Sequence, residues 1–397
     1  MKKYGVLLVI TLMLFSLPAQ ASEMPDLTTD CTITVGSKAF TKDRLFDRDY
    51  ATYWNGEDSG KTVTIHSPEA IHGLYICWLS APRAWAVEEK INGQWQKTSF
   101  EASPFQHAYY PLNGAKEIRL KPEGKSKKWF GMSEIFILGK GELPPYVQTW
   151  KEAERGSDLL LLFAHPDDEA LFFGGTLPYY AGELGLNVTA CAFTPATPLR
   201  VSELLNSLWT MGVKNYPVLG PFHDTYSLKL DKAYRDFGKS KVQRFAVELL
   251  RKYQPKVIVS HDVDGEYGHG MHQLCADMML YAFDAAADAG KFSQSAKEFG
   301  TWQASKLYLH LYKDNPIVMD WDKPLRAFSG KTGYEVAKLG YAQHLSQHRY
   351  EQYQVEPKDS ENSSYHFGLA KTTVGLDTLK NDFFENIDLG TFQVEGE

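Results

Sequence analysis

Two short clusters of histidine and carboxylate side chains are the part of this sequence best suited to chemistry. Their members are His165, Asp167 and Asp168 within residues 164–169, and His269 and His272 within residues 261–272. Imidazole and carboxylate groups suit a borderline metal such as zinc, and a catalytic zinc takes three protein ligands and keeps one position open. His165, one of the two aspartates and one of the two later histidines would supply these ligands. The remaining carboxylate and imidazole would be free to act as base and acid, as amide hydrolysis requires.

Each cluster directly follows a predicted buried strand. The apolar run Leu159–Phe163 ends before the first cluster, and the run Lys256–Ser260 ends before the second. Ligands of open α/β sheets bind outside the carboxyl ends of the strands, so both clusters stand where a site is expected. If a helix begins near Gly270, the later two histidines can share one side of its first turn.

The second part of the chain, from about residue 150, predicts an α/β fold. Buried strands are expected at 158–164, 187–193 and 256–260, and helices at 202–211 and 241–253. Continuous apolar strands that alternate with helices indicate a mostly parallel sheet with helices on both faces.

The first part of the chain predicts an antiparallel β-sandwich. Short β-rich runs recur between residues 31 and 140, and turn signals such as Asn92-Gly93 separate them. Residues 139–145 then resemble a linker. We therefore expect a signal peptide at 1–21, a sandwich domain at 22–143 and an α/β domain at 144–397.

The beginning of the sequence resembles a secretory signal. Lys2 and Lys3 precede an apolar run at residues 6–17, and Ala19-Gln20-Ala21 fits a cleavage site. The run is short for a membrane span, although an uncleaved anchor is the alternative. No later stretch is apolar enough to span a membrane, so we expect an exported protein that is periplasmic or secreted.

Composition excludes several classes of protein. Apolar residues make up 43% and charged residues 23%, as in globular proteins, and the formal net charge of −7 argues against a general nucleic-acid binder. The 4 cysteines do not form a disulfide framework. Cys31 and Cys77 could still form one bridge in an exported chain.

The two clusters together resemble the PIG-L (LmbE-like) family of zinc-dependent de-N-acetylases. The resemblance runs over most of residues 157–350, and its motifs are 165–169, 265–272, Arg200 with Glu203, and 344–347. Members of that family have a Rossmann-like fold and remove N-acetyl groups from glucosamine-containing molecules. The resemblance implies one catalytic zinc ion bound by His165, Asp168 and His272. Arg200 is a candidate substrate contact, although an ordinary helix-surface arginine fits equally well.

The resemblance also implies roles for three further residues. Asp167 would be the general base that deprotonates the attacking water. His269 would protonate the leaving amine or stabilise the tetrahedral intermediate, and Tyr267 would hydrogen-bond the carbonyl oxygen as negative charge develops. One departure is Met271, where the family often has an acidic residue beside the histidine. We expect another carboxylate to orient His269: Asp262, Asp264 or Glu266.

The first part of the chain resembles a discoidin-like, galactose-binding-like domain. The matching stretches are residues 45–54 and 132–139. Domains of this class often bind glycans, and four tryptophans could stack on sugar rings if exposed, although burial in the core is the favoured interpretation. They are Trp78, Trp85, Trp95 and Trp129. A calcium ion near Asp47 and Glu134 is a further hypothesis.

The preferred function is that of an exported zinc-dependent hydrolase, which removes an N-acetyl group from a glycan or glycoconjugate containing N-acetylglucosamine. One alternative is a non-catalytic glycan-binding protein with a degenerate hydrolase domain. Another is a zinc amidase or esterase that acts on a non-sugar substrate, because fold and ligands do not define the substrate.

Overall fold

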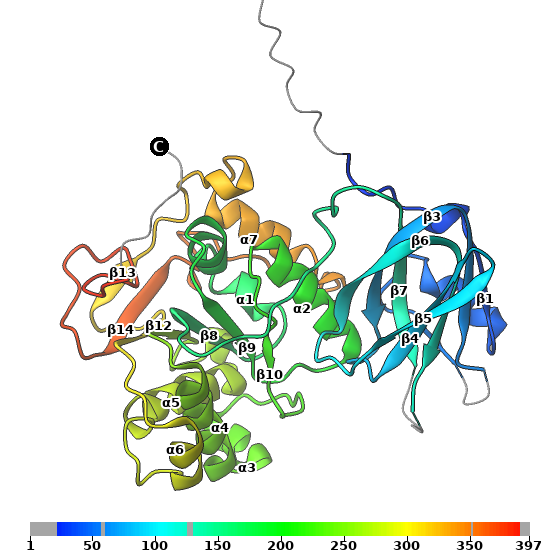
Figure 1. Cartoon of the computed structure of the whole chain (residues 1–397). Coiled ribbons are helices and arrows are strands. Elements are labelled where there is room, and N and C mark those ends of the chain that lie inside the picture. The colour runs from blue at the N-terminus through cyan, green and yellow to red at the C-terminus, as the bar shows by residue number, and fades with distance from the viewer. Residues whose placement is uncertain (1–21, 57–59, 125–129, 351, 390–397) are drawn as a thin grey trace, which may run out of the picture.

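The computed structural model describes residues 22–56, 60–124, 130–350 and 352–389. The expected signal peptide at 1–21 lies outside these residues. The described chain builds two seven-stranded sheets, one from its first part and one from its second (Figure 1). No helix among the described residues is long and apolar enough to cross a membrane.

The first sheet is antiparallel at every strand pair, as the sequence predicts. Its order is β2-β7-β3-β6-β4-β5, and β1 pairs with β3. Figure 1 shows the strands curving around a common core. The strands are β1 (Thr32–Val35), β2 (Trp54–Asn55), β3 (Val63–Trp78), β4 (Trp85–Ile91), β5 (Gln94–Phe100), β6 (His107–Pro122) and β7 (Gly131–Leu138).

Two of the four tryptophans considered for sugar stacking are buried in the core of the first sheet. Trp78 and Trp85 are each 1% exposed and pack edge to face, so neither is free to stack on a sugar ring. Trp95 is half-buried, and the Arg119 guanidinium lies 3.9 Å from its ring centre. Trp129 lies outside the described residues.

Cys31 and Cys77, which could have formed a bridge, are both free thiols. Cys31 interacts with Ser67, which lies near the start of β3, whereas Cys77 is buried near the end of that strand. At the proposed calcium position, Arg48 Nη1 lies 3.0 Å from Glu134 Oε2. That carboxylate therefore already has a positively charged partner.

The second sheet is mixed and mostly parallel. Its order is β10-β9-β8-β11-β12-β14-β13, in which the first four strand pairs are parallel and β14 is antiparallel to both of its neighbours. Chain order reverses between β8 and β11, the switch point at which open α/β sheets bind ligands. The strands are β8 (Leu159–Phe163), β9 (Val188–Ala192), β10 (Val218–Leu219), β11 (Val257–Ser260), β12 (Lys306–His310), β13 (Pro316–Val318) and β14 (His366–Thr372).

Helices cover both faces of this sheet (Figure 1). Leu159, Leu161 and Phe163 of β8 belong to one buried cluster, and Leu160 and Leu162 belong to the other. This alternation explains why the strand is apolar throughout. The helices are α1 (Asp168–Leu171), α2 (Pro198–Thr210), α3 (Leu230–Phe237), α4 (Lys239–Tyr253), α5 (Gly270–Ala285), α6 (Ser293–Phe299) and α7 (Gly333–Tyr341).

The first sheet contacts the helix that carries Arg200. Gln106, just before β6, donates from Nε2 to the carbonyl of Pro198 and to Ser202 Oγ, each at 3.1 Å. Its backbone N–H donates to the Tyr216 hydroxyl, also at 3.1 Å. The start of α2 is thereby held from the side of the β-domain.

Candidate active site

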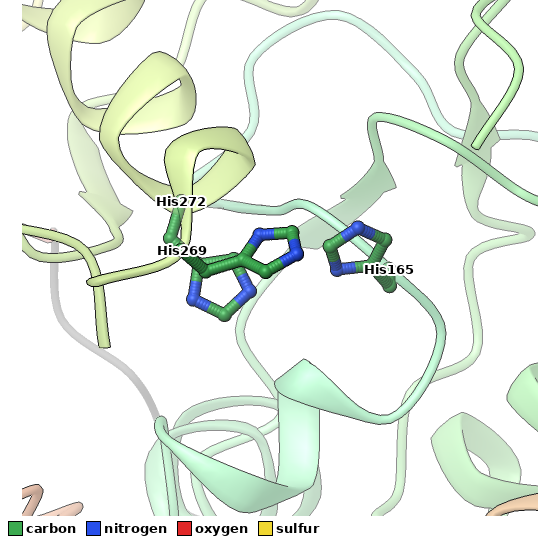
Figure 2. Close-up of side chains that lie close together, drawn as sticks. All are labelled: His165, His269 and His272. Carbon is green, nitrogen blue, oxygen red and sulfur yellow. The ribbon is translucent and has the colours of Figure 1, made fainter. Parts of the chain in front are cut away.

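Both predicted clusters lie together at the switch point of the second sheet. His165 stands in the loop after β8, and the loop after β11 leads to His269 and His272 at the start of α5. Figure 2 shows the three imidazoles facing one common space. Residues that are far apart in sequence therefore form one site, as the strand-end positions predict.

Two of the residues predicted to bind metal, His165 and His272, lie beside the third, Asp168. Its Oδ2 lies 3.2 Å from His165 Nδ1 and 3.5 Å from His272 Nε2. The backbone N–H of His165 also donates to this oxygen at 2.8 Å. Two sets among the described residues bring three ligand atoms within 4.8 Å of one another: His165 with His269 and His272, and Asp168 with His261 and His272.

Hydrogen bonding shows that His272 is prepared to bind a cation. Its Nδ1 lies 2.8 Å from Glu266 Oε2, so Nδ1 carries the proton and Nε2 presents a lone pair. That Nε2 is buried and has no hydrogen-bond partner among the described residues. Burial, and next the charge of His261, lower the pKa of His272, which favours the neutral form. The donor set therefore fits a metal ion.

His261 is the weaker candidate ligand, although it stacks on His272 with ring centroids 4.1 Å apart. The backbone N–H of Ala164 already donates to its Nε2 at 3.0 Å. Burial opposes the imidazolium, but Glu266 and Asp168 outweigh it and raise the pKa of His261 to about 10. In the neutral ring the Nε2 lone pair is already used by the N–H of Ala164, and in the charged ring Nε2 carries a proton. In either state His261 has no free lone pair for a metal ion.

Glu266 orients His272 and its neighbours His261 and His310, whereas the sequence predicts this carboxylate only as a candidate partner of His269. It accepts from Nδ1 of His261 and His272 at 2.8 Å each, and from His310 Nδ1 at 2.6 Å. Although burial alone would raise the pKa of Glu266, His261 and the hydrogen bonds hold it well below its usual range. His310 ends β12 and has no sequence motif that could have indicated it.

Asp167 lies beside the metal ligands in an unusual backbone conformation, with φ of 121°. Such conformations are strained for L-residues and concentrate at active sites. Arg200 Nη2 lies 3.0 Å from its Oδ1 and also contacts the carbonyl of Pro166. Burial raises the pKa of Asp167 to about 7, with Asp168 contributing and Arg200 opposing. Arg200 lines the cavity too, but its guanidinium mainly contacts the base candidate.

Glu169 and His344 support Asp167 from behind. Glu169 Oε2 accepts from the backbone N–H of Asp167 at 2.8 Å, and its Oε1 lies 2.6 Å from His344 Nε2. Both side chains are fully buried. His344, which in the sequence is named only as part of the resemblance, therefore hydrogen-bonds the residue that positions Asp167.

None of the carboxylates proposed to orient His269 does so. Its Nδ1 accepts instead from the backbone N–H of Met271 at 3.3 Å, as the N-cap of α5. This bond places the proton of the neutral ring on Nε2. Burial, and next the charges of His272 and His165, lower the pKa of His269 to about 3. The ring can therefore donate a hydrogen bond while uncharged.

Tyr267 and two unpredicted residues line the cavity in front of these groups. The cavity has a volume of about 430 Å³. Tyr267 has φ of 47°, is 47% exposed and interacts with the hydroxyl of Tyr353. Asp224 Oδ1 lies 3.6 Å from His165 Nε2, and Tyr226 follows Asp224 by two positions in the chain. The cavity is lined by His165, Asp167, Asp168, Leu171, Arg200, Asp224, Tyr226, Tyr267, His269, Gln347, Arg349, Tyr350, Gln352 and Tyr353.

Residues 160–283 match the sequence model of the PIG-L family, described as GlcNAc-PI de-N-acetylase. This segment carries both histidine clusters and the candidate metal centre. The match confirms the resemblance of this segment to the PIG-L family.

Curated relatives match about a third of the chain. A 1D-myo-inositol 2-acetamido-2-deoxy-alpha-D-glucopyranoside deacetylase 1 from Frankia alni is 30% identical over 37% of this chain and 60% of its own length. The 1D-myo-inositol 2-acetamido-2-deoxy-alpha-D-glucopyranoside deacetylase from Streptomyces griseus is 33% identical over 33% of this chain and 49% of its own length. The chain therefore spans only about half to two thirds of these relatives.

Two solved structures are similar to part of the chain. An N,N'-diacetylchitobiose deacetylase from Pyrococcus horikoshii is 18% identical, and the likeness covers 48% of this chain and 71% of that one with a TM-score of 0.36. The F5/8 type C domain of a Bacteroides fragilis protein is 13% identical and covers 32% of this chain and 100% of its own, with a TM-score of 0.26.

Proposed function

We propose that this protein is a zinc-dependent hydrolase that removes the N-acetyl group from a glycan or glycoconjugate containing N-acetylglucosamine. The observation that carries the proposal is the free, buried Nε2 of His272, which faces Asp168 and His165 beside an open cavity. The match to a de-N-acetylase family over the same residues supports the choice of reaction.

His165, Asp168 and His272 would hold the zinc ion. When bound, zinc polarises a carbonyl and lowers the pKa of water to about 7. Asp167 takes the proton of the attacking water at a carboxylate oxygen, and its pKa of about 7 suits that exchange near neutral pH. Arg200 and the Glu169 carboxylate hold Asp167 in place from two sides.

His269 and Tyr267 would act on the acetamide. The Nε2–H of His269 would donate a hydrogen bond toward the oxygen on which negative charge develops. The proton that Asp167 takes from the attacking water would pass on to the departing amine, so His269 stays neutral throughout. Tyr267 lies beside His269, with ring centroids 5.6 Å apart, and would donate its hydroxyl hydrogen to the same oxygen. Acetate and a free amino sugar are the products.

Two wider features belong to the same proposal. The strand order with its reversal between β8 and β11 supports a Rossmann-like domain at 144–397, preceded by a galactose-binding-like domain at 22–143. The basic, apolar and small-residue pattern of residues 1–21 supports export to the periplasm or medium. The N-terminal sequence of the purified protein tests export, because cleavage would leave Ser22 first.

The deciding experiment combines acetate release with metal content. Purified protein is incubated with N-acetylated glucosamine oligomers and, separately, with N-acyl amino acids and acetate esters. Release of acetate from the sugars by protein holding about one zinc per chain supports the proposal. Release only from the other panel would indicate an amidase or esterase. Sugar binding without metal uptake or acetate release would indicate a glycan-binding protein.

A further inference from the structure

A continuous belt of aromatic rings borders the candidate active site. We call it the tyrosine belt, and its order is Tyr226, His269, Tyr267, Tyr353 and Tyr350. Successive ring centroids lie 5.4, 5.6, 5.8 and 5.9 Å apart. All five residues line the same cavity. The belt thus extends to both sides of the histidine proposed to act on the acetamide.

Three of the four tyrosines of the belt are exposed to solvent. Tyr226 is 70% exposed, Tyr267 47% and Tyr350 38%. By contrast, Tyr180 and Tyr308 of the same domain are fully buried. Clustered, exposed aromatic side chains beside a cavity mark a ligand-binding surface, because burying them would otherwise stabilise the fold.

Backbone hydrogen bonds hold the belt in place. The carbonyl of Ser227 accepts from the N–H of Gly270 at 2.7 Å, which ties the Tyr226 loop to the start of α5. At the other end, the N–H of Tyr353 donates to the carbonyl of Tyr350 at 3.0 Å. The rings are therefore arranged before any ligand binds, which lowers the ordering cost of binding.

Polar side chains are interspersed with the rings of the belt. Asp224 precedes Tyr226 by two positions, and the other end of the cavity offers Gln347, Arg349 and Gln352. A pyranose ring has an apolar C–H face and a rim of hydroxyl groups. Tyrosine faces match the first, and amide and charged groups match the second.

We propose that the tyrosine belt binds several consecutive units of an N-acetylated oligosaccharide, with the reacting unit at His269 and neighbouring units on Tyr226 and on Tyr350. This inference rests on the proposed function and specifies its substrate as a chain rather than a single sugar. Rings that line the same cavity continue on both sides of His269, so a unit bound at His269 has aromatic rings available for its neighbours on either side.

The test is the dependence of binding and turnover on chain length. The zinc-loaded Asp167→Asn protein is titrated calorimetrically with the monomer, dimer, trimer and tetramer of N-acetylglucosamine, so that binding is read without turnover. The intact enzyme is assayed on the same series. We expect affinity and kcat/KM to rise at least tenfold from monomer to tetramer.

Variants at the ends of the belt sharpen the test. Tyr226→Ala and Tyr350→Ala should each remove most of the gain with chain length, whereas Tyr226→Phe and Tyr350→Phe should retain it, because the ring face is kept. Tyr146→Ala is the matched control, since this tyrosine is 42% exposed and does not line the cavity.

Equal affinity for monomer and tetramer, or an unchanged length dependence in both alanine variants, would overturn the belt as a chain-binding surface. Binding of the intact protein to lipid vesicles that is lost in the alanine variants, without length-dependent sugar binding, would assign the belt to a membrane instead. Length-dependent binding without acetate release from the intact enzyme would retain the belt and reject the proposed reaction.

Discussion

Glu266 and His272 form the hydrogen bond that defines the candidate metal centre. Glu266 Oε2 lies 2.8 Å from His272 Nδ1, while His272 Nε2 lies 3.5 Å from Asp168 Oδ2. The carboxylate thus fixes both the tautomer and the direction of the imidazole, as outer carboxylates do in zinc sites. The arrangement has consequences that can be measured without knowing the substrate.

Glu266→Gln should weaken zinc binding by about 10- to 100-fold. The glutamine replaces one accepting oxygen with an N–H₂ group, which then faces an imidazole N–H of His261, His272 or His310. Competition with a chelator measures the change. Asp264→Asn is the matched control, since its side chain is 77% exposed on the same loop. Equal zinc affinity of the Glu266→Gln protein and the intact protein would contradict the assigned role.

The two histidines at the start of α5 should respond differently to removal. His272→Ala should lose zinc, whereas His269→Ala should retain about one zinc per chain and lose at least about 100-fold in turnover. His269 also lies close enough to be a ligand, so the experiment distinguishes His272 from His269 as the metal ligand. Elemental analysis and acetate release are the measurements.

His223→Ala is the control for this pair, because His223 is exposed and lies one residue from the cavity-lining Asp224. Loss of zinc in His269→Ala, with zinc retained in His272→Ala, would exchange the two assignments.

Sequence reasoning placed the residues of the candidate metal centre together because they follow strand ends. Predicted strands at 158–164, 187–193 and 256–260 correspond to β8 (Leu159–Phe163), β9 (Val188–Ala192) and β11 (Val257–Ser260). Parallel strands bring their carboxyl ends to one edge, so two local patterns sufficed to place the histidines together. The start of α2 was set four residues late, although Thr197 as N-cap and Pro198 at the first helical position signalled it.

The residues that orient the site were not predictable in the same way. His310 reaches Glu266 across 44 positions, and His344 reaches Glu169 across 175. Such contacts depend on tertiary packing and leave no local periodicity. The orientation of His269 was missed for another reason: the donor is a backbone N–H of Met271, and side-chain identity carries no information about it.

Arg251 should be a main determinant of stability. Its guanidinium is fully buried and donates to five backbone carbonyls and to Ser295 Oγ around the end of α5. Arg251→Ala leaves several buried acceptors unpaired, so we expect a loss of at least about 3 kcal/mol in the free energy of unfolding. Denaturant titration measures it. The exposed neighbour Lys252→Ala should change stability by less than about 0.5 kcal/mol, and an equally small loss for Arg251→Ala would contradict the prediction.

The pH dependence of turnover should report the pairing of Asp167 with Arg200. Asp167 must be ionised to accept a proton, and burial raises its pKa to about 7. As pH falls below about 7 the carboxylate is protonated, so kcat/KM should fall about tenfold per unit of pH. Because the charge of Arg200 opposes this shift, Arg200→Gln should raise the pKa further and move the acid limb to higher pH.

The Arg200→Gln enzyme should therefore lose most activity at pH 7 and recover part of it at pH 9. Arg326→Gln is the matched control, since Arg326 is 82% exposed and pairs with Glu183 away from the cavity. An acid limb that stays in place in Arg200→Gln, with only KM increased, would show that this guanidinium serves the substrate rather than the base. That outcome would restore the simpler prediction of a substrate contact and leave Glu169 as the residue that holds Asp167.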